Sequence, residues 1–544
     1  MPASKADLLL RGGPILRSAS SDLVEALAVR SGRVLASGGI EELEPLVGPA
    51  TRVIELRGRS AVPGFNDAHQ HLLSLGRSMQ QVNLRPGAVG SLAELLDAVK
   101  TRAEQAPPGD WVVGGRYDHY HLDVKRHPLR EELDRAAPDN PVYIRRACGH
   151  MGVANTRALA MAGIDEATPD PPGGHIEKSQ GRLTGLLQER AQAMVHSVIP
   201  PQSIDTLVEC IELAGRHMLA RGVTSVMDAA VGGVQGFDDY LAYQRARHDA
   251  RLPVRVYMAM YGGPAGIMEE CIRIGLSTGA GDDRLKVGPA KIFADGSAGG
   301  KTAAMREPYL GETPDRGIFL YSTDELETLA GRYHEAGFQV AIHAIGDAAI
   351  DQALAVYEKV LDKHPAADRR HRIEHCGYIV PEHIDIMVRR GIFPAPQPVF
   401  VYDFGDLYLE VLGEKRAHSC YPMRTWAEHG LHPAASSDAP VCDTNVMTNI
   451  YSMMTRKTST GVTLGESERL TLRGALCASS YNGAYLSFSE TVKGTLLPGQ
   501  LADIAVTSRD LFTLTPEEIL ATEVDLTVVD GEIVFDRLQE HLSA

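Results

Sequence analysis

The chain has 544 residues, of which 70 are acidic and 54 basic, and its formal net charge is −16. A chain of this length exceeds one ordinary hydrophobic core, so we expect a large domain and a smaller one. An acidic chain without a dominant basic face is not expected to bind nucleic acid or an anionic membrane. The apolar run Leu8 to Leu10 is far too short for a signal peptide or a membrane span. No other apolar run approaches the length that a membrane span needs.

The cysteines indicate a reducing environment. There are seven of them, an odd number, and no two form a C-x-x-C pair. A disulfide framework or a zinc knuckle is therefore not expected, and the simplest prediction is a cytoplasmic protein.

Both ends of the sequence consist of short strand-like segments separated by turn residues. Pairing of these ends predicts one small composite β-sandwich domain, built from residues 1–60 and 490–544, because chain termini often lie close together. Asp530-Gly531 is typical of a hairpin turn, and Gly12-Gly13 and Ser31-Gly32 are further turn signals. The predicted strands are Asp7–Ile15, Ala26–Leu35, Arg52–Leu56, Ala502–Val506, Leu526–Val529 and Glu532–Phe535.

Between the two ends, over residues 61–489, short apolar strands alternate with amphipathic helices such as Ser203–Arg221 and Thr323–Ala336. This alternation is typical of βα units around a parallel sheet, and eight such strands predict an α/β fold of the TIM-barrel, (β/α)₈ type. A stretch from about residue 84 to 200 is predicted as an insertion after the first strand, without an assigned fold. The eight strand candidates are Ala61–His71, Thr224–Asp228, Val254–Met260, Leu285–Ala294, Gln339–His343, Arg372–His375, Phe393–Pro396 and Pro433–Ser437.

The first barrel strand ends in Asp67-Ala-His69-Gln-His71. Residues two apart on a strand face the same way, so both imidazoles can reach one metal ion. The pattern alone is weak, because 20 histidines in 544 residues give roughly 0.7 such pairs by chance. A second pair, His119-Tyr-His121, lies in a polar stretch that predicts a loop, and we interpret it as surface or pocket wall. The first pair is placed where catalytic groups of a barrel gather.

Lys291 lies within an apolar strand, where a lysine is rarely buried without a reason. One interpretation is an ion pair with Asp295, which has the same strand parity. The other is a lysine of depressed pKa whose neutral amine can react. The sequence leaves these two interpretations open.

Three further candidates end predicted strands. His343 closes Gln339-Val-Ala-Ile-His, His375 closes Arg372-Ile-Glu-His, and Asp438 follows Ala435-Ser-Ser. Taken singly, each is compatible with a hydrogen-bonded structural histidine or a turn aspartate. Taken together, a barrel mouth that collects four histidines, a lysine and an aspartate suits a zinc site with an open position for water.

These residues resemble the amidohydrolase superfamily, and several segments resemble its amidohydrolase-3 branch, whose members include hydrolases of N-substituted formamides. The likeness runs over nearly the whole chain. The segments that carry it are Val62-Pro-Gly-Phe-Asn-Asp-Ala-His-Gln-His71, Leu133-Asp-Arg-Ala-Ala-Pro-Asp-Asn-Pro-Val142, Gly149-His150, Asp295-Gly-Ser297, Ser437-Asp-Ala-Pro440 and Gly494-Thr-Leu-Leu-Pro-Gly-Gln-Leu-Ala-Asp503.

The resemblance implies a metal-dependent hydrolase that cleaves an amide-type C–N bond of a small molecule, with a metal-bound hydroxide as nucleophile. It implies one or two zinc ions, bound by His69, His71, His343, His375 and Asp438 together with a carboxylated Lys291. Asp438 would also accept the proton of the attacking water and pass it to the leaving nitrogen. With two ions, the carbamate would bridge a more buried metal on the His69 side and a more exposed one on the His343 side.

The sequence departs from the branch at two places that concern the substrate. Lys301 stands where arginine is usual, and Tyr117-Asp-His119 replaces a stretch that contains tryptophan. His150 and Tyr117 are weaker candidates for the substrate pocket, equally compatible with ordinary loop residues. The alternatives are an isomerase or lyase with the same ligands, a hydrolase of cyclic amides or amidines, and a non-enzymatic protein that kept the fold. Whether the chain forms a homo-oligomer is left open.

Overall fold

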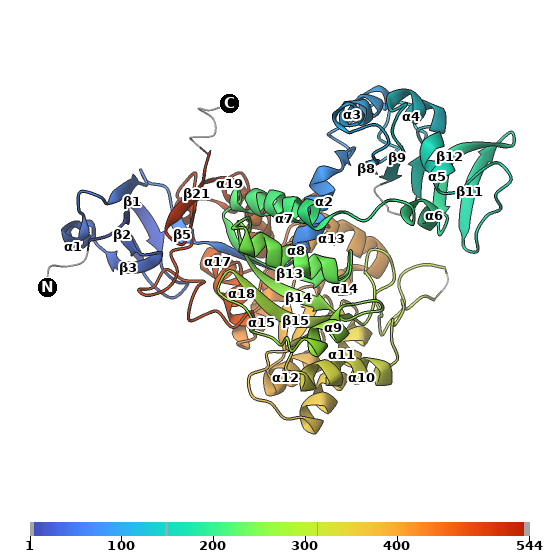
Figure 1. Cartoon of the computed structure of the whole chain (residues 1–544). Coiled ribbons are helices and arrows are strands. Elements are labelled where there is room, and N and C mark those ends of the chain that lie inside the picture. Colours follow the sequence, from blue (N-terminus) through green and yellow to red (C-terminus); the bar gives the residue numbers. More distant parts are fainter. Residues whose placement is uncertain (1–4, 147–150, 313, 538–544) are drawn as a thin grey trace. The chain divides into compact units, whose positions relative to one another are not determined.

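The computed structural model describes residues 5–146, 151–312 and 314–537, and the chain forms two compact units. The first comprises Met1–Leu75 and Ile211–Ala544, and the second comprises Gly76–Cys210. Each unit has its own sheet or sheets (Figure 1) and its own apolar core. None of the helices within the described ranges has the length and apolar character needed to cross a bilayer.

One sheet of the first unit is shared by the two ends of the chain. Its strand order is β21-β20-β19-β5-β1-β2-β3, with β4 paired to β1, and the central junction is the antiparallel pair of β5 and β19. A composite sheet is therefore present, whereas its arrangement as a sandwich and the domain bounds stay predictions. The strands are β1 (Leu8–Leu16), β2 (Leu23–Arg30), β3 (Arg33–Gly38), β4 (Arg52–Glu55), β5 (Ala61–Pro63), β19 (Ile504–Thr507), β20 (Val524–Val529) and β21 (Glu532–Asp536).

Two details of this sheet differ from the predicted strands. Ala26–Leu35 is a hairpin, because Ser31 and Gly32 adopt positive φ angles of 48° and 76° and reverse the chain between β2 and β3. Gly12-Gly13 lies inside β1, where the pairing register with β2 shifts between Arg11 and Ile15. A side chain at Gly13 would meet the Arg59 carbonyl at 2.3 Å, so the glycine is required by close packing of backbone.

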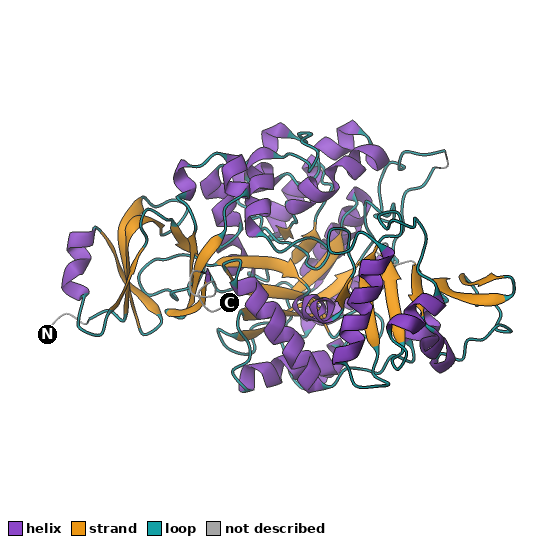
Figure 2. Ribbon diagram, turned by 90° about the horizontal axis from the view of Figure 1, so that it is seen from above, coloured by secondary structure: helices purple, strands orange, loops and turns teal. Residues whose placement is uncertain are grey.

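The second sheet of this unit is a parallel, nearly closed barrel of seven strands in the order β18-β17-β16-β15-β14-β13-β6. Helices lie outside the strands, as expected for βα units (Figure 2). The strands are β6 (Phe65–Gln70), β13 (Val223–Val231), β14 (Arg255–Tyr261), β15 (Leu285–Phe293), β16 (Val340–Ala344), β17 (Arg372–His375) and β18 (Phe393–Ala395). The longer helices are α7 (Ile204–Leu219), α8 (Phe237–His248), α10 (Thr323–Glu335), α11 (Asp347–Lys363), α12 (Pro381–Arg390), α13 (Val399–Leu412) and α16 (Val446–Thr455).

The predicted eighth strand, Pro433–Ser437, does not form a ladder. It runs beside β6, and the amide of Asp438 donates to the His69 carbonyl at 2.8 Å. However, Pro433 has no amide hydrogen, and the amide of Ala435 donates to Ala478 rather than to a neighbouring strand. The segment therefore fills the remaining side of the barrel as extended chain.

The second unit contains the predicted insertion and has a fold of its own. Its six-stranded sheet has the order β11-β12-β10-β9-β8-β7, in which β7, β8 and β9 are parallel and the others antiparallel. Residues such as Leu95, Val99 and Leu133 pack its helices on the sheet. The strands are β7 (Val82–Asn83), β8 (Val112–Tyr117), β9 (Val142–Arg146), β10 (Met151–Ala154), β11 (Gly174–Ser179) and β12 (Arg182–Glu189), and the helices include α3 (Leu92–Gln105), α4 (Arg130–Ala136) and α5 (Thr156–Met161).

Candidate metal centre

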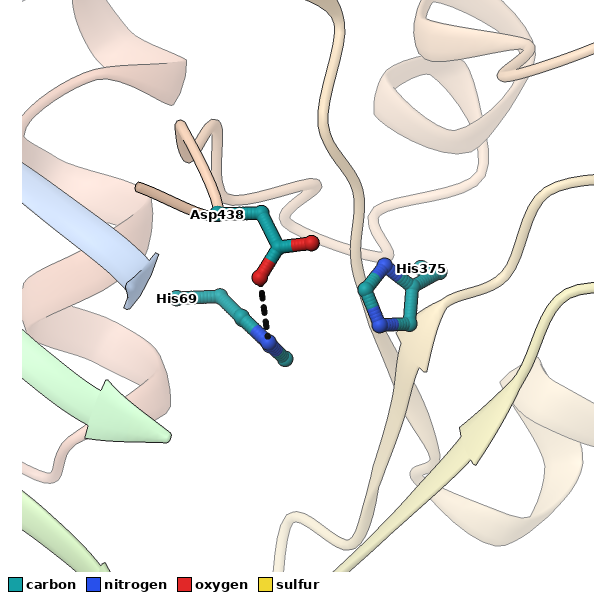
Figure 3. A group of neighbouring side chains, drawn as sticks. All are labelled: His69, His375 and Asp438. Carbon is teal, nitrogen blue, oxygen red and sulfur yellow. Dashed lines mark ion pairs between the residues drawn. The ribbon is translucent and has the colours of Figure 1, made fainter. Parts of the chain in front are cut away.

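The carboxyl ends of the barrel strands bring the predicted ligands together. His69 is in β6, Lys291 in β15, His343 in β16 and His375 at the end of β17, and Asp438 follows the extended segment beside β6. Parallel strands of a barrel deliver their last residues to one mouth, which is where barrel enzymes place their chemistry. Donor atoms of His69, His375 and Asp438 all lie within 4.8 Å of one another (Figure 3).

Asp438 lies at the centre of the cluster. Its Oδ1 atom is 3.4 Å from His69 Nε2 and 3.2 Å from His71 Nε2, so both imidazoles of the His-x-His pair reach one carboxylate oxygen. The ring of His375 is 4.8 Å from that of His69 and 4.3 Å from that of His343, measured between centroids. The four histidines thus form one continuous array.

Two of these residues are held in an unusual backbone conformation. His375 has φ of 67° and Asp438 has φ of 55°, a region that residues other than glycine seldom occupy. Hydrogen bonds hold both turns, from the Cys376 amide to the Ala344 carbonyl and from the Asp438 amide to the His69 carbonyl. Strain of this kind persists where surrounding contacts impose it, and it is common at functional sites.

Each of three imidazoles uses one ring nitrogen for a fixed partner. Nδ1 of His69 is hydrogen-bonded to Glu374, and Nδ1 of His375 is 2.6 Å from the Gln397 side-chain carbonyl. Nε2 of His343 lies 3.1 Å from the Gly296 carbonyl. Because these acceptors take the N–H, the opposite nitrogen of each ring is left as an acceptor able to bind metal.

Two of the imidazoles, those of His343 and His375, are held neutral by burial. Burial lowers the pKa of His343 to about 3, with a further contribution from Lys291, and burial lowers the pKa of His375 well below its ordinary value. Desolvation disfavours the charged form of a histidine, and only the neutral form offers a lone pair to a metal.

Lys291 is fully buried, and among the described residues its Nζ atom has no hydrogen-bond partner. The amine lies over the ring of Phe293 at 4.7 Å, and burial lowers the pKa of Lys291 to about 8. Asp295 instead accepts backbone amides from Ala304 and from the Ile345–Gly346 turn. The interpretation of Lys291 as an ion-pair partner of Asp295 is therefore wrong.

The carboxylate of Asp438 is ionised. Burial alone would raise the pKa of Asp438, but contacts with His69 and His71 lower it well below its ordinary value. An ionised, buried carboxylate between two imidazoles can bind a metal or accept a proton.

The donor atoms of the cluster fit a divalent metal. Four buried polar atoms of this cluster have no hydrogen-bond partner within the described parts of the chain. They are His69 Nε2, His343 Nδ1, Lys291 Nζ and Asp438 Oδ1. Buried polar groups are almost always satisfied, so four such atoms in one cluster indicate a missing ligand. Nitrogen and carboxylate donors are those that zinc prefers.

The weaker substrate-pocket candidates fall elsewhere. His150 lies outside the described residues. Tyr117 is buried in the core of the second unit, where its hydroxyl is 2.8 Å from His127 Nδ1, and its role in a pocket stays a prediction. His119 and His121 follow β8 in the predicted loop, and His119 Nδ1 accepts a hydrogen bond from Arg146 Nε.

Three residues of the site were not among the sequence candidates: Glu374, Arg372 and Gln397. Arg372 binds Glu374 through both carboxylate oxygens, at 2.7 and 3.1 Å, and both side chains are buried. Charged residues two apart in an apolar strand share one face, so Arg372-Ile-Glu374 carried a usable signal. Gln397 gave no such signal in the sequence, since a glutamine after a strand is common.

Comparison with known proteins identifies the family of the chain. The chain belongs to the amidohydrolase family, whose sequence model matches residues 52–535. It is 31% identical over 529 residues to the putative amidohydrolase YtcJ of Bacillus subtilis, covering 95% of this chain and 97% of that protein. It is 29% identical over 528 residues to N-substituted formamide deformylase of Arthrobacter pascens, covering 95% and 96%.

A solved structure extends the likeness to the fold. An uncharacterized metal-dependent hydrolase from Pyrococcus horikoshii matches with a TM-score of 0.78 and 26% identity, over 94% of this chain and 99% of that one. The predicted family is confirmed. The chain is a metal-dependent hydrolase of the amidohydrolase superfamily and acts on carbon–nitrogen bonds other than peptide bonds.

Proposed function

We propose that the chain hydrolyses the C–N bond of a small N-substituted amide, with N-substituted formamides as the first candidates and zinc as the metal. The observation that carries the proposal is the cluster of four donor atoms at the barrel mouth that have no hydrogen-bond partner among the described residues. The similarity to N-substituted formamide deformylase supports the choice of substrate.

His69, His71, His343, His375 and Asp438 would hold the metal, together with Lys291. A divalent metal bound there polarises a carbonyl group and lowers the pKa of a water molecule, which supplies a nucleophile at neutral pH. The chain's own contribution is orientation and proton transfer. Asp438, which lies beside His69 and His71, would accept the proton of the attacking water and deliver it to the leaving nitrogen, which departs as a neutral amine.

We further propose that Lys291 is carboxylated. Its amine is buried and unpartnered, and its lowered pKa leaves a substantial neutral fraction that can add to carbon dioxide. The resulting carbamate would add oxygen donors and a negative charge in the middle of a site that is otherwise rich in imidazoles.

Replacement of Asp438 tests the mechanism. Asp438→Asn keeps the shape of the side chain but cannot accept a proton, so kcat for hydrolysis of N-formyl amines should fall at least about a hundredfold. The fold and most of the zinc should be retained, as measured by circular dichroism and elemental analysis.

Asp443→Asn is the matched control. Asp443 lies five residues further on in an exposed turn, where it accepts the amide of Asn445, and its replacement should change kcat little. Equal effects of the two substitutions, or a loss confined to KM, would contradict the role of Asp438. Full activity of protein free of metal would contradict the proposed function itself.

A further inference from the structure

The acceptors behind the imidazoles differ in charge. His69 is backed by the carboxylate of Glu374 and His375 by the neutral amide of Gln397, whereas His343 faces both the backbone carbonyl of Gly296 and, at 3.4 Å, the carboxylate of Asp295. Acceptors of this kind fix the ring orientation and change the basicity of the metal-binding nitrogen.

Each acceptor is itself rigidly held. Glu374 is fully buried and bound by Arg372 through both oxygens, and Arg372 in turn donates to the Ala68 carbonyl beside His69 at 2.9 Å. Gln397 is equally buried, and its amide donates to the Ser436 hydroxyl at 2.9 Å and to the Ala395 carbonyl at 3.2 Å. Neither acceptor can rotate away without breaking several buried hydrogen bonds.

We propose that Glu374 and Gln397 are positioning residues that make the metal centre unequal, with His69 as the stronger donor and His375 as the weaker one. A carboxylate behind an imidazole pulls on the Nδ1 proton and increases the electron density at Nε2, and a neutral amide does so less. Metal is therefore held mainly from the β6 side of the site and exchanges more readily on the β17 side. This inference rests on the proposed metal site.

Reciprocal isosteric replacements test it, with zinc alone as the probe. Zinc would be titrated into metal-free protein by competition calorimetry, and cobalt absorption would report the ligand field. Glu374→Gln should weaken zinc binding on the order of 10- to 100-fold, and Gln397→Glu should strengthen it on the order of tenfold. These readouts do not depend on catalysis.

Asp503→Asn is the matched control, because Asp503 is also a buried carboxylate bound by an arginine, Arg255, but touches no imidazole of the site. It should lower stability and leave zinc affinity unchanged. An affinity of Glu374→Gln within about twofold of the parent, or an equal loss in Asp503→Asn, would overturn the inference. If Glu374→Gln fails to fold, Gln397→Glu still decides, since unchanged affinity there also overturns it.

The outcomes separate this inference from the proposed function. A parent protein that binds no zinc would contradict both the proposed function and the inference. If the parent binds zinc and hydrolyses amides, but the Glu374→Gln variant binds zinc equally well, only the inference is contradicted.

Discussion

Lys291 is the residue whose chemistry depends most on its surroundings. On a strand exposed to water it would be an ordinary cation, but here it is buried beneath the mouth, against the ring of Phe293. The depressed pKa follows from burial first, with the carboxylates of Glu374 and Asp438 opposing it. A lysine in such a place is suited to covalent modification rather than to an ion pair.

Replacing this lysine should therefore remove metal. Lys291→Ala is expected to lower metal affinity at least about tenfold, with a matching loss of activity. Short-chain carboxylic acids should restore part of both, because they can occupy the space of the carbamate. Metal content by elemental analysis and activity with and without propionate would measure the effect.

Lys286→Ala is the control for this experiment, since Lys286 is the second residue of the same strand, β15, at the end away from Lys291, and donates to the Ser489 hydroxyl. It should not change the metal content. A Lys291→Ala protein with full metal and full activity would contradict the assignment of the lysine to the site.

The ligand candidates could be predicted from sequence because each ends an apolar segment, and strand ends meet at one mouth. Their orienting partners could not be predicted in the same way. Glu374 is 305 positions from His69 along the chain, and only the closure of the barrel, which brings the end of β6 near β17, makes them neighbours. The local sequence pattern predicts which face of a strand a residue occupies, but it does not predict which residue across the barrel it contacts.

At the scale of elements, the periodic segments were predicted best. Helices α7 and α10 begin and end within two residues of the expected bounds, because capping residues and amphipathic spacing are local properties. The prediction of an eighth barrel strand was wrong. A ladder needs a partner strand in matching register, and the amide of Ala435 donates instead to the carbonyl of Ala478. The fold of the insertion required long-range pairing and was not predicted.

The N-terminus of α10 offers a test of one such local signal. The Ser322 hydroxyl caps the helix by accepting a hydrogen bond from the amide of Glu325, and the Glu325 carboxylate accepts one from the amide of Ser322. Ser322→Ala should lower the free energy of unfolding by about 1 kcal/mol, seen as a reduced thermal midpoint.

Ser20→Ala is the comparison, since Ser20 is exposed and, within the part of the chain that the structure describes, its hydroxyl has only a long contact of 3.5 Å to Ser18. It should leave the midpoint unchanged. Equal midpoints for the two variants would show that the Ser322 cap does not contribute to the stability of the barrel.

At the scale of the first unit, one buried arginine connects the barrel to the sheet at the chain ends. Arg255 begins β14 and donates to Asp503 at 2.7 and 2.9 Å and also to Asp530. Burial alone would raise the pKa of Asp503, but the hydrogen bonds from Arg255 lower it below its ordinary value. The carboxylate is therefore charged in the folded protein over a wider pH range than in the unfolded chain.

This arrangement predicts a pH-dependent stability. Because the folded pKa of Asp503 is lowered, its contribution is fully present above the ordinary aspartate pKa of about 4 and is lost as the pH falls through the folded pKa. Asp503→Asn should cost about 3 kcal/mol at pH 7, and the difference from the parent should shrink below about pH 4. Denaturant unfolding at several pH values measures this, and a difference independent of pH would contradict it.

The pairing of β5 with β19 has a further consequence for how the protein is made. A ribosome releases β5 early, whereas β19 emerges only when synthesis is almost complete, so until then β5 has an open edge. Unpaired strand edges invite association with other chains, and pairings between distant segments form slowly. The nascent chain must therefore keep this edge from aggregating while the barrel is still being translated.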